Sequence, residues 1–342
     1  MNLKNRCLAS ALAAFLVAPA LSAQTAHELP RADAEILPGA VQLHSAKEYR
    51  KAARYPSHNQ LVAVGAVDPV HDKGIAHKMF LRAEQDGPEV AVWTAKPAYR
   101  ANEGIPFFAE AKGQKLVSVS GDIVNQNGEQ VGYLSFLEGA SGLEKAPAAW
   151  SANAVLNKSL PTPELAEAYL VKLQAVLEDG TTLYGSTGFL VSNPWAELTG
   201  EYRDQIVDGN LVVSAQVEVT REGRFHLAGS LAAGNEPFAT SQTAVVLEPG
   251  LHWIDLDFYG LMFHDRQAKG ALRLAALQLR TTGGMPNALN DLVENVHVIK
   301  PLKSQALTRQ AVYDRDLMDL ADQLEGEAME ARDKAGLAAV SQ

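Results

Sequence analysis

The run Gly250-Leu-His-Trp-Ile-Asp-Leu-Asp-Phe-Tyr-Gly260 lies in the segment from Leu211 to Lys300, which decides the fold of this chain. Within the run, three apolar residues alternate with three others that face the opposite way: Ile254, Leu256 and Phe258 against Trp253, Asp255 and Asp257. A period of two is typical of a β-strand with one buried face. The same alternation runs from Leu211 to Val219 and resumes at Phe225. We therefore expect successive strands of one antiparallel sandwich.

Further strand candidates bring this module to about seven, the number typical of an immunoglobulin-like sandwich. They are Ala196 to Tyr202, Gln242 to Leu247, Leu272 to Leu279 and Val293 to Ile299. In the segment from Leu272 to Leu279 the apolar phase changes near Ala275-Ala276. A change of phase inside a strand predicts a β-bulge at that point.

Two stretches of this module carry a resemblance. One is the spacing Gly-x-x-Trp-x-x-Leu-x-Phe-x-Gly from Gly250, and the other is Leu277 to Asn287 leading to Leu292-Val-Glu-Asn295. They resemble a domain-of-unknown-function family of exported proteobacterial proteins built from tandem immunoglobulin-like domains. The resemblance covers the last third of the mature chain well and the middle third loosely. It implies a fold and an exported location, and it brings no known activity.

The N-terminus predicts export. Lys4 and Arg6 precede an apolar run, and Leu21-Ser-Ala23 ends in small residues. This pattern is typical of a Sec-type signal peptide, with cleavage expected after Ala23. The run is shorter than the ~20 apolar residues of a membrane span, and no later stretch reaches that length. We expect a periplasmic or secreted protein without an integral membrane segment after cleavage.

Composition narrows the possible functions. The single cysteine, Cys7, lies in the signal, so we expect no disulfide, thiolate nucleophile or cysteine-bound zinc in the mature chain. The net charge is −10, and loss of Lys4 and Arg6 makes the mature chain still more acidic. An acidic chain without a basic stripe is poorly suited to phosphate backbones, so no nucleic-acid partner is expected.

The pattern of turns and strands predicts five parts. They are a signal peptide (1–23), an N-terminal lead-in (24–86), two immunoglobulin-like sandwiches (87–194 and 195–300) and a helical acidic tail (301–342). Asn127-Gly128 predicts a hairpin in the first sandwich. In the lead-in, a short helix is expected from Ser45, strands are expected at Gln60 to Val67 and Lys78 to Ala83, and the segment is expected to pack on the adjacent sandwich.

The tail changes its period. Tyr313, Leu317, Leu320 and Leu324 recur every three or four residues, which predicts one apolar face of a helix. One interpretation is a surface helix that lies on its own sandwich. The other is a helix that docks onto another envelope protein.

Two groups of residues are candidates for a metal site. His71, Asp72 and His77 lie close in sequence, but this spacing matches no established ligand set, and a solvated loop with unrelated histidines is the favoured interpretation. Asp255 and Asp257 would lie about 7 Å apart on one strand face, and His264 and Asp265 follow, which allows a calcium site if a loop adds oxygens. The plainer interpretation is the solvent face of an outer strand, with Trp253 beside it.

No catalytic motif was found in the sequence. We therefore expect a mainly β, non-catalytic binding or scaffolding protein of the cell envelope, without catalytic residues, cofactor or metal. One alternative is an exported enzyme or accessory domain with its site in the loop 141–167 or between the sandwiches. Another is a calcium-stabilised surface module.

Overall fold

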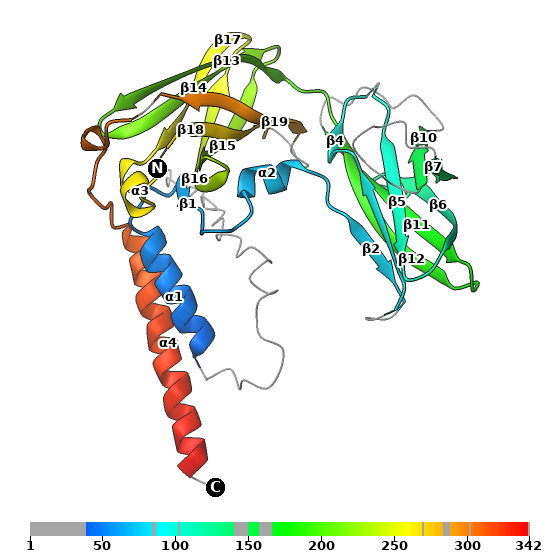
Figure 1. The fold of residues 1–342 in the computed structure, drawn as a ribbon, viewed down its shortest axis with the longest axis horizontal. Coiled ribbons are helices and arrows are strands. Elements are labelled where there is room, and N and C mark those ends of the chain that lie inside the picture. The colour runs from blue at the N-terminus through cyan, green and yellow to red at the C-terminus, as the bar shows by residue number, and fades with distance from the viewer. Residues whose placement is uncertain are drawn as a thin grey trace, which may run out of the picture. The chain divides into compact units, whose positions relative to one another are not determined.

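The computed structural model describes residues 39–83, 87–101, 103–139, 150–156, 166–268, 270–282, 288–300 and 302–340. It is mainly β, with antiparallel sheets and a C-terminal helix (Figure 1). Two separate hydrophobic cores lie within the unit Ala46–Gln323. This architecture agrees with the predicted fold class. Among the described residues, no helix is long and apolar enough to cross a membrane.

The first core belongs to a sandwich of two sheets. Its first sheet has the order β2-β3-β5-β9-β8, with β2 (Met79–Arg82), β3 (Glu89–Thr94), β5 (Pro106–Lys112), β8 (Leu137–Glu138) and β9 (Trp150–Asn153). The second has the order β10-β7-β6-β11-β12-β4, with β4 (Ala98–Tyr99), β6 (Leu116–Val124), β7 (Gln130–Ser135), β10 (Val155–Leu156), β11 (Glu167–Leu177) and β12 (Thr182–Val191). The predicted hairpin at Asn127-Gly128 is confirmed: it joins β6 to β7, and Gly128 has a φ of 80°.

The second core lies between a three-stranded and a five-stranded sheet. The smaller sheet has the order β13-β14-β17, with β13 (Ala196–Val207), β14 (Asn210–Val219) and β17 (Gly250–Phe258). The larger has the order β1-β16-β15-β18-β19, with β1 (Asn59–Leu61), β15 (Gly223–Ala233), β16 (Glu236–Leu247), β18 (Leu272–Thr281) and β19 (Ala288–Ile299). The largest fully buried side chains of this core include Phe225 and Phe258.

The predicted bulge in β18 is confirmed. Leu274 pairs with Leu231 and Ala276 pairs with Ser230, so Ala275 is the extra residue. The bulge explains how Leu272 and Leu274 in one phase, and Leu277 and Leu279 in the other, are all buried in the same core. A bulge re-aims the side chains that follow it.

The lead-in differs from the expectation that it would pack on the adjacent sandwich. Its strand β1 pairs with β16 of the second sandwich, and only β2 pairs with β3 of the first. The residues expected to be a loop form helix α2 (Pro69–Gly74), because Asp68 caps it by accepting hydrogen bonds from the backbone N–H groups of Val70 and His71. The predicted helix from Ser45 begins earlier, as α1 (Ala40–Ala52).

The remaining helices follow β17 and β19. They are α3 (Gly260–Asp265), the 3₁₀ turn Ser304–Ala306 and α4 (Arg315–Val340). The two long helices, α1 and α4, lie side by side (Figure 1). Gly39 fits directly against the backbone of Ala328, and Arg50 forms an ion pair of 2.6 Å with Asp322. The tail helix therefore packs on another helix of the chain.

Candidate functional site

The four acid and histidine residues considered as a calcium site do not form one cluster. Asp255 and Asp257 share the outer face of β17, as expected, while His264 and Asp265 lie on α3. The Asp265 carboxylate binds Arg54, at 3.0 Å, and accepts a hydrogen bond of 2.6 Å from the Tyr55 hydroxyl. Among the described residues, no group of three or more histidine, cysteine, aspartate or glutamate side chains could hold a metal ion.

Tyr55 and Asp265 form a half-buried pair. The pKa of the Tyr55 hydroxyl is raised well above its usual value, first by burial and then by its hydrogen bond to the Asp265 carboxylate. The hydroxyl therefore stays protonated throughout the physiological range and serves as a fixed donor. This pair joins the end of α1 to the end of α3.

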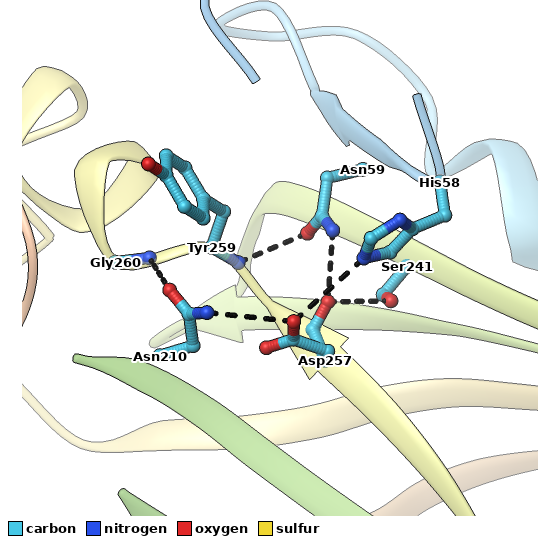
Figure 2. A network of polar contacts seen from close by, with 7 residues as sticks. All are labelled: His58, Asn59, Asn210, Ser241, Asp257, Tyr259 and Gly260. Carbon is cyan, nitrogen blue, oxygen red and sulfur yellow. Dashed lines mark hydrogen bonds and ion pairs between the residues drawn. The ribbon is translucent and has the colours of Figure 1, made fainter. Parts of the chain in front are cut away.

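A polar network centred on Asp257 lies at the edge of the second sandwich (Figure 2). The backbone oxygen of Asp257 accepts two hydrogen bonds, one from Asn59 Nδ2 at 2.9 Å and one from Ser241 Oγ at 2.8 Å. Its carboxylate oxygen Oδ2 lies 3.4 Å from Asn210 Nδ2 and 3.8 Å from His58 Nε2. The network thus joins β1, β14, β16 and β17.

Asn59 is the most constrained member of this network. Its amide nitrogen donates to Asp257, and its amide oxygen accepts from the Tyr259 backbone N–H at 3.0 Å. The residue is only 7% exposed. A single side chain therefore satisfies a carbonyl and an N–H on either side of the point where β17 ends.

Asn210 does the same for the next residue of the chain. Its amide oxygen accepts from the Gly260 backbone N–H at 3.1 Å. Asn210 follows the turn Asp208-Gly209, where both residues have positive φ values of 48° and 81°. The two asparagines therefore satisfy the N–H groups of Tyr259 and Gly260, where α3 begins.

The chemistry available at this network is structural. Ser241 Oγ donates to the backbone oxygen of Asp257, whereas His58 Nε2 faces the Asp257 carboxylate. Asp257 Oδ1 is buried without a hydrogen-bond partner among the described residues. The arrangement holds the start of α3 and the added strand β1 in place.

The histidines of the lead-in diverge. His71 Nε2 lies 3.0 Å from Glu294 Oε1 on β19, whereas His77 Nε2 lies 2.9 Å from the backbone oxygen of Asp72. The two histidines thus contact different partners, in agreement with the interpretation that they are unrelated. His71 is used to fasten α2 to the sheet.

Trp253 lies on the outer face of β17, as expected. The Arg203 guanidinium stacks over its ring at 4.3 Å, and the Trp253 side chain remains 38% exposed. A cation above an aromatic face is an attractive contact. Trp253 therefore packs against a residue of the same sheet.

Sequence reasoning missed both asparagines of the network. Asn210 had a local signal, because the Asp-Gly-Asn turn predicts a tight hairpin between β13 and β14. Asn59 had none, since its partners lie about 200 residues further along the chain.

Residues 195–292 match the family model described as "Domain of unknown function (DUF4785) C-terminal domain". One similar solved structure is a DUF4785 family protein from Legionella pneumophila subsp. pneumophila str. Philadelphia 1, at 20% identity and a TM-score of 0.41. That alignment covers 61% of this chain and 58% of the Legionella chain. Another is a two-domain fibronectin type III segment of chicken tenascin, at 9% identity and a TM-score of 0.21, covering 65% of this chain and all of that one. No curated protein matches. The second sandwich is thus similar to a domain of a family of unknown function.

Proposed function

We propose that this chain is an exported, non-catalytic protein of the cell envelope that binds or scaffolds another envelope protein through its C-terminal helix. Antiparallel sandwiches and a match to a family of unknown function are compatible with such a module. The observation that carries the proposal is the spacing of small residues on α4.

Helix α4 has apolar or small residues at alternating intervals of four and three. They are Leu317, Ala321, Leu324, Ala328, Ala331 and Ala335. This spacing is the heptad pattern by which one helix packs along another. Gly39, immediately before the start of α1, lies against Ala328, and α4 continues from there to Val340. Ala331 and Ala335 continue the stripe beyond this contact, and we infer that they face a partner helix.

Site-specific photo-crosslinking in the native host tests this interface. A photoreactive residue in place of Ala335 is expected to give an adduct of higher mass, because this position continues the stripe. The matched control is Asp333, which is exposed and lies about 200° around the helix from Ala331. Adducts of equal yield at both positions, or at neither, would contradict the proposal.

Export is a separate proposal with its own test. It rests on the signal-like segment 1–23, which lies outside the described residues. Protein purified from the periplasm or medium is expected to begin at Gln24 when its N-terminus is sequenced. A full-length chain beginning at Met1, recovered from the cytosol, would contradict export.

Two alternatives stay predictions. The first is an exported enzyme or accessory domain with its site in the loop 141–167 or between the sandwiches. Most of that loop lies outside the described residues. The calcium module would use Asp255 and Asp257, and their alanine variants should then abolish any calcium-dependent shift in melting temperature.

A further inference from the structure

Helix α2 lies on the outer face of the five-stranded sheet of the second sandwich. At its start, Ser230 of β15 donates a hydrogen bond to the carboxylate of Asp68. At its end, a Cβ atom on Gly74 would meet Gln278 Nε2 of β18 at 3.1 Å and Leu292 of β19 at 2.9 Å. These contacts fix the direction of α2 across β15, β18 and β19, and they place its last turn beside the next row of the sheet.

The next row of the sheet is the cross-strand pair His226 and Arg280, and four basic side chains come together around it. His226 of β15 lies directly opposite Arg280 of β18, and Arg224 follows two residues away on the same face of β15. Lys73 lies in the last turn of α2, and its charge acts on the His226 imidazole. Like charges directly opposite each other on neighbouring strands are destabilising. A protonated imidazole at His226 would therefore be unfavourable beside Arg280 in the absence of an anion.

The described acidic side chains on the elements that pack here face other partners. Asp68 caps α2 and binds Ser230, Asp72 lies beside His77, and Glu294 pairs with His71. The residues of β16 on this face are uncharged: Thr240, Gln242, Ala244 and Val246. Among the described side chains, Lys73, Arg224 and Arg280 have no carboxylate within salt-bridge distance.

The electrostatics of His226 reflect this excess of positive charge. Burial lowers the pKa of its imidazole below the usual 6.5, and the charges of Arg280, Lys73 and Arg224 lower this pKa further. Gln242 Oε1, which lies 3.2 Å from His226 Nε2, acts in the opposite direction. The positive charges of Arg280, Lys73 and Arg224 therefore all act on the His226 imidazole.

We propose that His226, Arg280, Arg224 and Lys73 form a binding site for a small tetrahedral oxyanion of the phosphate class. The four donors come from two strands and a helix, so they approach from several directions, as the oxygens of a tetrahedral anion require. The Nε and Nη2 atoms of Arg280 both donate to Gln278 Oε1. These bonds hold the guanidinium in place. They also occupy its Nε–Nη2 edge, which would otherwise be available for bidentate binding of a planar carboxylate.

The site is tested first with sulfate, whose charge stays constant through the titration of histidine. Sulfate is expected to shift the imidazole NMR signals of His226 and to raise its pKa, because a bound anion favours the imidazolium form. Its affinity should therefore increase as the pH falls through the pKa values of His226 in the bound and free protein. Affinity independent of pH, with no shift at His226, would overturn the proposal.

Variants separate binding from folding. Arg280→Gln is expected to weaken sulfate binding about tenfold and to raise the pKa of His226 in the free protein. Lys73→Gln changes an exposed side chain and should weaken binding about threefold without affecting the fold. Its matched control is Lys47→Gln, on an exposed position of α1, which should leave binding unchanged. Equal effects of the two lysine variants would contradict the site.

Two further probes distinguish the source of the anion. Inorganic phosphate is measured by calorimetry, and phosphatidylcholine vesicles containing phosphatidic acid are measured by co-sedimentation. Binding of phosphate alone would indicate a soluble ligand, and binding of both, lost in Lys73→Gln, would indicate a phosphate headgroup. Failure of both probes would overturn the proposal but would leave the helix-mediated partner of α4 untouched, because the crosslinking result does not depend on this face.

Discussion

Replacing Asn59 by alanine is expected to lower the free energy of unfolding of the second sandwich by about 3 kcal/mol. The substitution leaves the part-buried backbone N–H of Tyr259 without its acceptor and removes one of the two donors to the Asp257 backbone oxygen. A buried polar group left unsatisfied costs the full penalty of its desolvation. It also weakens the attachment of β1, which is only three residues long.

The measurement is urea-induced unfolding in a background with Trp93→Phe and Trp150→Phe, so that the fluorescence comes from Trp195 and Trp253 of the second sandwich. Gln60→Ala is the matched control, because this residue lies on the same strand and its side chain is exposed. The control should change the free energy of unfolding by no more than about 0.5 kcal/mol. If both variants unfold at the same urea concentration, the Asn59 network does not stabilise the sandwich.

Replacing Gly260 by alanine is expected to destabilise the same sandwich by about 3 kcal/mol, for a steric reason. A Cβ atom at this position would lie 2.2 Å from the backbone oxygen of Gly209 and 2.6 Å from the backbone nitrogen of Thr308. These two atoms share a hydrogen bond of 2.8 Å. Because backbone atoms cannot rotate aside as a flexible side chain can, three segments of the chain would have to move.

Thermal melting provides the measurement, with a fall of about 10 °C expected for Gly260→Ala. Gly104→Ala is the control, since nothing lies within 4 Å of its Cβ position and its φ is not positive. The control should be neutral or slightly stabilising, because alanine reduces the entropy of the unfolded chain. If Gly260→Ala melted at the same temperature as the wild type, the contact of Gly260 with Gly209 and Thr308 would be looser than in the structure.

The strands and the bulge of the second sandwich could be predicted from sequence because their signals are local. The phase change at Ala275-Ala276 is visible in six residues, and β18 shows the bulge there. The short strand β1 and the helix α2 could not be placed, because their partners are distant. Asn59 pairs with Ser241, and Asp68 binds Ser230, through contacts that no short-range pattern encodes.

The candidate sites show the same division. The shared face of Asp255 and Asp257 followed from the strand period, and the structure has it. The opposition of His226 and Arg280 depends on the register between β15 and β18, which the bulge shifts. A basic cluster of this kind is invisible in an acidic composition because its members are dispersed over the sequence between Lys73 and Arg280.

The pairing of β1 with β16 makes the second sandwich a discontinuous domain into which the first sandwich is inserted. During synthesis, residues 59–61 leave the ribosome long before the strand that they join. The inserted sandwich can complete its own sheets before β16 is synthesised and β1 can pair with it. A fragment that begins at residue 195 would expose the edge of β16 and would lack Asn59. We therefore expect the second sandwich to fold last and to require residues 59–61.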